Sequence, residues 1–220
     1  MRNETVFTDV TALLLAGGQS TRFGKPNKLL ATYERRPLLD HVVTTVSRLT
    51  GSRPVVAVRS SEQRETISEA LFRPDTVRFA LDDRTFRGPI AGIYGGLDAV
   101  ETPWILVCAG DMPLLSSEAL QWLSAQRPDR QVDAVVPVND EGIVEPLHAL
   151  YRRSAIETAR ETIAGGAGVQ SLLSSFDDVL EVRMADAPHR LGASLTNINT
   201  QRELAMLKNS YEPVRTEMII

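Results

Sequence analysis

Apolar runs of strand length alternate with helical patterns through the first half of the chain, and this alternation limits the possible folds most strongly. Runs at 10–15, 54–59 and 104–109 have the length and the near absence of polar residues typical of strands buried on both faces. Residues 37–49 repeat apolar side chains at helical spacing, and a second helix is expected from Ser60 to about Leu71. This order predicts an α/β fold with a mostly parallel sheet and helices on both faces.

Further elements are marked by proline and serine in the first half and by a turn in the second. A short strand is expected at 77–81, and helices are expected to begin at Pro89 and at Ser116 or Ser117. Later, apolar runs at 133–138 and 144–151 flank an Asp-Glu-Gly turn, as in an antiparallel strand pair. The remaining expected elements are helices at 154–164, 169–176 and 200–207 and a strand at 179–184.

A glycine pair followed by basic residues comes directly after the first expected strand. Gly17 and Gly18 carry no Cβ, so the backbone can turn tightly and bring its N–H groups against an anion. Arg22, Lys25 and Lys28 add three positive charges, which suit a polyphosphate better than a single carboxylate. The stretch suggests a nucleoside triphosphate site, although a solvated surface loop is the commoner role of such residues taken alone.

Two well-known phosphate-binding motifs do not match this loop. The P-loop places four residues before its Gly-Lys pair, whereas five separate Gly18 from Gly24 here, and Pro26 stands where Ser or Thr is needed. The dinucleotide fingerprint fails as well, because Gly17 and Gly18 are adjacent. A nucleotide site here would therefore be of another class, and a flexible, solvated surface loop stays the alternative.

Composition excludes several other classes of protein. The chain has 220 residues, 43% of them hydrophobic, which suits one well-cored domain. Its net charge of -4 argues against nucleic acid as a partner. The single cysteine, Cys108, cannot form an internal disulfide and is expected to be a buried core residue. No signal peptide or membrane-spanning run is visible, so we expect a cytoplasmic protein with no membrane partner.

Acidic residues stand where expected strands end. Open α/β sheets bind ligands at the carboxyl ends of their strands, so Asp111 and the pair Asp82 and Asp83 are candidate site residues. Asp111 suits a magnesium ion, which needs only one or two protein carboxylates; a turn or cap is the alternative role. Asp82 can accept hydrogen bonds from a nucleoside, or Asp82 and Asp83 can simply pair with Arg84 and Arg87.

Six motifs together resemble the molybdenum cofactor guanylyltransferase family, known as MobA, over nearly the whole chain. In order they are LLLAGGQSTRFG, KLL, GPIAGI, LVCAGDMPLL, EPLHALY and LTNINTQREL. The first and fourth are shared by many nucleotidyltransferases of one fold, whereas GPIAG, EPLHALY and the Asn-Ile-Asn-Thr segment point more narrowly to this family. The resemblance implies a magnesium-dependent enzyme that joins GMP from GTP to the terminal phosphate of molybdopterin, with or without molybdenum, and releases pyrophosphate.

The resemblance also implies an organisation and a set of site residues. One nucleotidyltransferase domain with a Rossmann-like sheet is expected over 1–208, with a nucleotide-binding half at about 8–125, an acceptor-binding half at about 130–208 and a loose tail at 209–220. The residues implied for GTP are Leu15, Ala16, Gly17, Gly18, Lys28, Asp82 and Asp111, with Asp111 also the metal ligand. Those implied for catalysis are Arg22, Lys28 and Asp111. Those implied for the acceptor or the phosphates are Asn197 and Asn199, whose alternative role is a turn leading to Thr200. His148 is expected as a core or rim residue; if it touches substrate, it is expected to line the acceptor side together with Glu145.

Several alternatives stay open at this level. The family commonly has an acidic residue before the loop lysine, but this chain has Asn27 there, and Lys25 competes with Lys28 for the phosphate role. The nearest other functions are a molybdopterin cytidylyltransferase and a sugar-phosphate nucleotidyltransferase of the same fold. A non-catalytic GTP-binding regulator is a third alternative. Transient contacts with other cofactor-biosynthesis or acceptor proteins are also expected.

Overall fold

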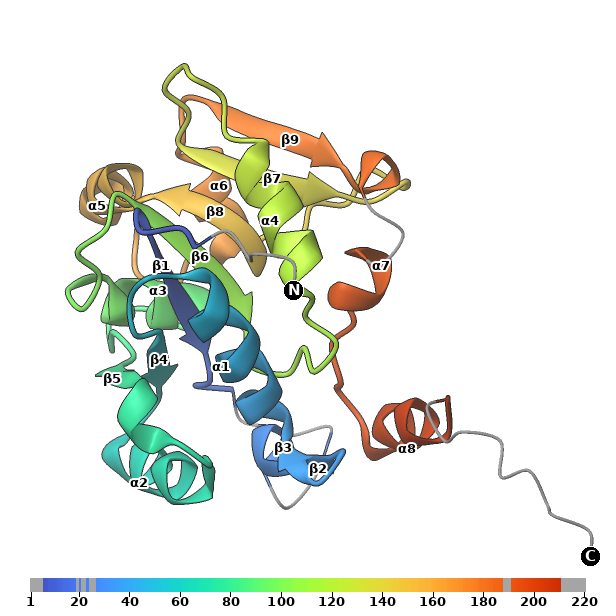
Figure 1. Ribbon diagram of the computed structural model, residues 1–220. Helices are drawn as coiled ribbons and strands as arrows, with labels where there is room; N and C mark the ends of the chain where they lie inside the picture. The colour runs from blue at the N-terminus through green and yellow to red at the C-terminus, as the bar shows by residue number, and fades with distance from the viewer. Residues whose placement is uncertain (1–5, 19, 21–22, 24–26, 188–190, 211–220) are drawn as a thin grey trace, which may run out of the picture.

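A mixed sheet with helices on both faces forms the centre of the computed structural model, which describes residues 6–18, 20, 23, 27–187 and 191–210 (Figure 1). Within these residues the sheet has seven strands in the order β5-β4-β1-β6-β8-β7-β9. Their bounds are β1 Val10–Leu15, β4 Val55–Val58, β5 Arg78–Leu81, β6 Trp104–Ala109, β7 Ala134–Val138, β8 His148–Arg152 and β9 Val179–Arg183. A separate hairpin pairs β2 Thr32–Tyr33 with β3 Arg36–Pro37.

Strand directions confirm the expected α/β class. β1 runs parallel to both β4 and β6, and β4 runs parallel to β5. β8 lies antiparallel to β6 and to β7, and β7 runs parallel to β9. The expected strand at 144–151 is too long, because β8 begins only at His148 and Val144 makes an isolated bridge to Val138.

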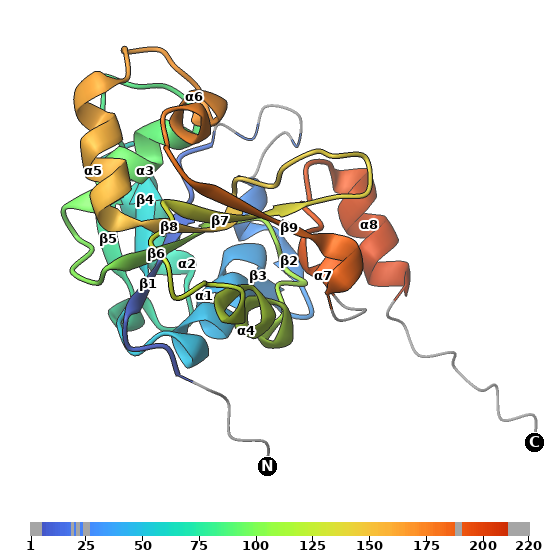
Figure 2. The ribbon, with the colours of Figure 1, turned by 90° about the horizontal axis from the view of Figure 1, so that it is seen from above.

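Helices cover the two faces of the sheet, as the view from above shows (Figure 2). The α-helices are α1 Leu38–Leu49, α2 Ser61–Ala70, α3 Pro89–Leu97, α4 Ser117–Ala125, α5 Arg153–Thr162, α6 Val169–Ser174, α7 Leu191–Ser194 and α8 Gln201–Ser210. Short 3-10 helices are η1 Lys28–Leu30, η2 Pro74–Thr76 and η3 Met184–Asp186. α1, α2 and α4 pack on one face, and α3, α5 and α6 pack on the other. No helix among the described residues has the length and apolar character needed to cross a membrane.

Alternation along the central strands divides their side chains between two cores. In β1, Ala12 and Leu14 join the core under α1 and α4, while Leu13 joins the core under α3. All three are fully buried, which accounts for the unbroken apolar run in the sequence. Because β1, β4, β5 and β6 run parallel, their carboxyl ends lie at one edge of the sheet.

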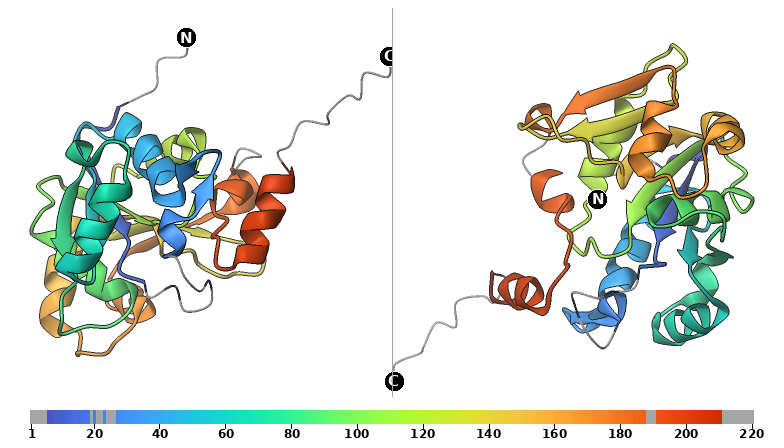
Figure 3. Two further views of the ribbon diagram at one scale, coloured as in Figure 1. Left: turned by 90° about the horizontal axis from the view of Figure 1, so that it is seen from below. Right: turned by 180° about the vertical axis from the view of Figure 1, so that it is seen from behind.

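A third apolar cluster packs the C-terminal segment 198–207 near that edge of the sheet. Ile198, Leu204 and Leu207 pack with Phe23 and Tyr33, so that α8 lies beside the β2–β3 hairpin (Figure 3). The helix expected from Thr200 is confirmed and begins with a capping box: Thr200 Oγ1 accepts from the Glu203 N–H at 3.1 Å, and Glu203 Oε2 accepts from the Thr200 N–H at 3.0 Å. α8 continues to Ser210, two residues into the expected tail; residues 211–220 lie outside the described part.

Candidate functional site

A cavity of about 710 Å³ opens at the carboxyl ends of β1, β4, β5 and β6. This is the place where open α/β sheets bind their ligands. The site residues expected from the sequence that line it are Leu15, Ala16, Gly17, Gly18, Lys28, Asp82, Asp111, Asn197 and Asn199. Arg22 and Lys25 lie outside the described residues.

At one wall of this cavity the backbone of Gly17 lies directly against the Asp82 side chain. A Cβ built at Gly17 would overlap Asp82 Oδ2, so no larger residue fits without displacing the carboxylate. Burial raises the pKa of Asp82, and the nearby charge of Arg59 partly offsets that rise. Asp82 Oδ1 is buried and has no hydrogen-bond partner among the described residues. It is therefore free to accept a hydrogen bond from a ligand donor.

Gln63 connects the residue that follows β1 with the residue that follows β4. It was not predicted as a site residue. Its side chain is buried, donates to Ala16 O at 2.8 Å and accepts from the Arg59 N–H at 2.8 Å. The sequence predicted only a helix beginning at Ser60, and Ser60 Oγ does cap the Gln63 N–H at 3.2 Å. The end of β1 and the end of β4, where Arg59 lines the cavity, are thereby held together.

Lys28, Asp111 and Asn199 meet on the opposite wall. Lys28 Nζ forms an ion pair with the Asp111 carboxylate and donates to Asn199 Oδ1 at 3.1 Å. The Ile198 N–H donates to Asp111 O at 3.0 Å, which fixes the C-terminal segment beside the end of β6. The neighbouring Asn197 Oδ1 is buried without a partner among the described residues. The Asp111 carboxylate and Asn199 Oδ1 thus both contact the Lys28 ammonium group.

The backbone around Lys28 is shaped by Ser20 and Asn27. Asn27 Oδ1 accepts from the Leu29 N–H at 3.1 Å and from Ser20 Oγ at 3.2 Å. The Lys28 N–H donates to Ser20 Oγ at 3.2 Å, and Ser20 adopts a φ of 52°. Asn27 therefore caps η1 and closes the loop, a role that an acidic residue can also perform.

Two residues expected at the acceptor, Glu145 and His148, lie outside the lining of the cavity, although Leu147 reaches it. His148 is fully buried opposite Cys108 in the β6–β8 pair, and neither ring nitrogen has a partner among the described residues. Burial lowers the pKa of His148 to about 3, so the ring is neutral near pH 7. Burial also raises the pKa of Glu145 and raises that of the Cys108 thiol to about 12.

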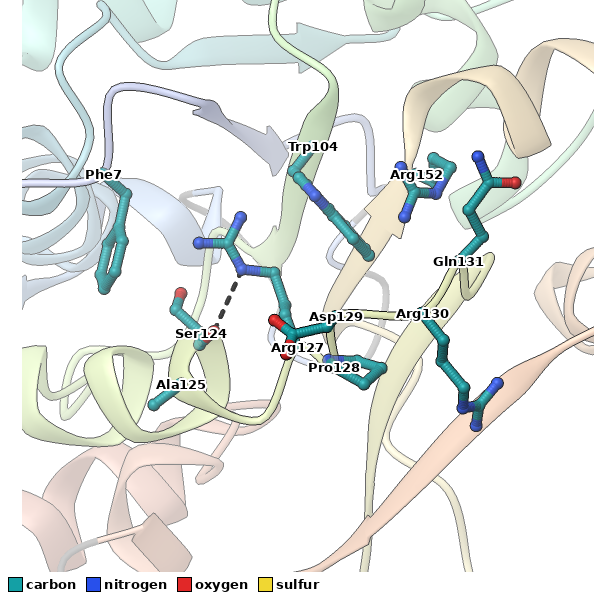
Figure 4. Close-up of a pocket in the computed structure, with 10 residues that line it drawn as sticks. All are labelled: Phe7, Trp104, Ser124, Ala125, Arg127, Pro128, Asp129, Arg130, Gln131 and Arg152. Atoms are coloured by element: carbon teal, nitrogen blue, oxygen red, sulfur yellow. Dashed lines mark hydrogen bonds between the residues drawn. The ribbon is translucent and has the colours of Figure 1, made fainter.

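A second hollow of about 590 Å³ lies at the other end of the central strands, where Trp104 begins β6 (Figure 4). The guanidinium groups of Arg127 and Arg152 lie 5.5 and 4.7 Å from the Trp104 ring, one on each side. Arg127 also pairs with Asp9 at 2.6 Å, and Arg152 Nε donates to Val132 O at 2.8 Å. These cations already have partners, and none of the expected site residues is present. The first cavity is therefore the candidate functional site.

Comparisons with known proteins show the family of this chain. The model of the MobA-like NTP transferase domain matches residues 12–180. A probable molybdenum cofactor guanylyltransferase of Natronomonas pharaonis is 35% identical over 88% of this chain and 94% of its own. One of Methanosarcina mazei is 30% identical over 93% of this chain and 92% of its own. The crystal structure of molybdopterin-guanine dinucleotide biosynthesis protein A from Archaeoglobus fulgidus superposes with a TM-score of 0.70 and 26% identity, over 91% of this chain and 97% of that one. A chain matched over this length, with its glycine loop and strand-end aspartates at one cavity, belongs to the MobA-like NTP transferase family.

Proposed function

We propose that this protein is a molybdenum cofactor guanylyltransferase. It transfers GMP from GTP to the terminal phosphate of molybdopterin, with or without bound molybdenum, and releases pyrophosphate. The observation that carries the proposal is the convergence of Lys28, Asp111 and Asn199 beside the glycine loop of one cavity. Relatives named for the same reaction cover about the whole chain, which supports this reaction over others of the fold.

The donor set of this cluster fits a magnesium ion. Carboxylate and amide oxygens are ligands that Mg²⁺ accepts, and those of Asp111 and Asn199 already share one cation, the Lys28 ammonium. We therefore propose Asp111 as the metal ligand and Asn199 Oδ1 as a second one. Magnesium bound there would stabilise the negative charge that develops on the phosphates as pyrophosphate leaves.

The residues of the chain supply positioning and charge rather than a covalent intermediate. The backbone N–H groups of Gly17 and Gly18 bind phosphate oxygens, while Lys28, with Arg22 of the same loop, neutralises the α- and β-phosphates. Leu15, Ala16 and Asp82 face the nucleoside. The acceptor phosphate is already anionic, so it attacks the α-phosphorus without a general base. A neutral, buried His148 is consistent with this, because no proton needs to be removed.

For the acceptor side we propose Asn197 and Asn199, which line the cavity next to Asp111. The buried, unpartnered Oδ1 of Asn197 is available to a substrate hydroxyl or amino group. Glu145 and His148 would act on the acceptor indirectly, by supporting the segment that carries Leu147 into the cavity. The Glu145 carbonyl accepts from the His148 N–H at 3.2 Å, as such support requires.

The test of the proposed function is magnesium-dependent pyrophosphate release with molybdopterin as acceptor, comparing GTP, CTP, ATP and UTP. Release with GTP alone is the expected result. Release with CTP alone would still support the proposed metal site, but it would show that the protein is a cytidylyltransferase. Release with a sugar phosphate as acceptor, and not with molybdopterin, would place the protein among the sugar-phosphate enzymes. GTP binding without any release would leave a non-catalytic regulator.

Gly17 gives a prediction about nucleotide binding. Gly17→Ala is expected to raise the KM for GTP about tenfold or more, because the added Cβ displaces the Asp82 carboxylate from the cavity wall. The matched control is Gly192→Ala, since a Cβ at Gly192 meets nothing within 4 Å and α7 does not line the cavity. Steady-state kinetics of both variants checks the prediction. A normal KM for GTP in Gly17→Ala would show that the nucleotide does not use this wall.

A further inference from the structure

The segment 82–88 supplies one wall of the nucleotide cavity, and its shape depends on Asp83. The residues of this segment that line the cavity are Asp82, Asp83, Arg84, Phe86, Arg87 and Gly88. Asp83 Oδ1 accepts from the Thr85 N–H at 2.9 Å, and the Asp83 N–H donates to Ala91 O at 2.8 Å. The Asp83 side chain thus forms a tight turn with Thr85, and the Asp83 N–H connects this turn to Ala91 in the first turn of α3.

Asp83 is paired with an arginine from the second half of the chain. Arg160 of α5 donates through Nη2 to Asp83 Oδ2 at 2.8 Å, where the sequence suggested Arg84 or Arg87 as partner. The Asp83 side chain is 14% exposed and that of Arg160 is 38% exposed. The Thr85 N–H is the largest cause that lowers the pKa of the Asp83 carboxyl; burial opposes it, and the Thr85 hydroxyl and Arg160 lower the pKa further by smaller amounts, so the carboxylate is charged at neutral pH.

The same arginine also contacts the layer behind the wall. Its guanidinium lies 5.8 Å from the Tyr94 ring, and Tyr94 packs against Phe86 with ring centroids 4.6 Å apart. Close by, a Cβ at Gly165 would come within 3.1 Å of Thr85 O, so the loop after α5 also presses on this turn. Arg160 therefore touches both the turn and the aromatic pair that support the lining residues.

We propose that Arg160 is a positioning residue for the nucleotide: it acts through Asp83 to hold segment 82–88 in the conformation that binds GTP. The inference rests on the proposed function, because it assumes that GTP occupies this cavity. An ion pair with one partner this exposed contributes little to global stability. Its loss is expected to alter the wall of the cavity more than the fold.

Titration of the intact protein with GTP in the presence of Mg²⁺ tests the inference without needing the acceptor. Arg160→Gln and Asp83→Asn are each expected to weaken GTP binding about three- to tenfold, with little change in kcat at saturating GTP. The double variant is expected to bind GTP no more weakly than Arg160→Gln alone, since that substitution already removes the contact with Asp83. Arg160→Lys keeps the charge and is expected to recover part of the affinity.

The control is Arg153→Gln, which removes the exposed ion pair of Arg153 with Glu157 on the same helix. It is expected to leave GTP affinity unchanged and to shift the thermal unfolding midpoint about as much as Arg160→Gln. Unchanged GTP affinity in Arg160→Gln would overturn the inference, as would equal losses in Arg153→Gln. Failure of the unmodified protein to bind GTP would instead refute the proposed function, and the inference with it.

Discussion

Replacing Asp111 by asparagine is expected to lower the rate of pyrophosphate release about a thousandfold or more while the protein stays folded. The substitution keeps the shape of the side chain and removes the charge that we propose to hold the metal. A metal that stabilises developing phosphate charge contributes several kcal/mol to the rate, which corresponds to about three powers of ten. Lys28 loses its ion pair but keeps its bond to Asn199, so the local structure has a remaining support. Initial-rate kinetics over a range of Mg²⁺ concentrations measures the effect.

Asp40→Asn is the matched control, because Asp40 is also a buried, ion-paired aspartate but does not line the cavity. Arg36 Nε donates to its carboxylate at 2.8 Å, and the Phe72 N–H donates to it at 3.2 Å. This variant is expected to lose stability and keep its specific activity. Equal loss of activity in both variants would mean that Asp111→Asn damages the fold, and would contradict a metal-binding role.

The layers of the fold were predictable from the sequence because strands buried on both faces leave a continuous apolar run. Val10–Leu15 and Trp104–Ala109 are such strands, and both were found within one residue of their expected bounds. The strand expected at 144–151 was less well predicted. Its first four residues contain Pro146, whose carbonyl accepts from Tyr151 Oη at 2.8 Å. Val144 makes only an isolated bridge to Val138 of β7, and residues 146–147 form a turn instead of a continuous strand.

Residues of the candidate site could be predicted from the sequence only where their place at the end of a strand determines their place in the fold. The carboxyl ends of parallel strands meet at one edge, so the neighbourhood of Gly17, Asp82 and Asp111 followed from strand order. Asn199 was predicted only through the family resemblance, since its contact with Lys28 joins residues that are 171 positions apart in the sequence. Arg160 was missed for the same reason: a contact formed by helix packing leaves no local pattern.

Replacing Lys28 by methionine is expected to slow pyrophosphate release about a hundredfold and, without nucleotide, to tighten the binding of Mn²⁺, used as a stand-in for Mg²⁺. The first effect follows because one charged donor to developing phosphate charge is typically worth two to three powers of ten in rate. The second follows because the Lys28 ammonium occupies the space between the oxygens of Asp111 and Asn199. Removing it frees both oxygens for a divalent cation. Kinetics and a titration of free Mn²⁺ by electron paramagnetic resonance measure the two effects on the same preparation.

The opposite signs of these two effects make the Lys28 experiment informative. A variant that is merely damaged would lose activity and metal affinity together, whereas an ammonium that competes with the metal predicts a loss of one and a gain of the other. Lys25→Met serves as the loop control and is expected to cost less activity and to leave Mn²⁺ affinity unchanged. Equal losses of activity in both lysine variants would contradict the assignment of Lys28 to the phosphates. Unchanged Mn²⁺ affinity in Lys28→Met would show that the cation lies elsewhere than between Asp111 and Asn199.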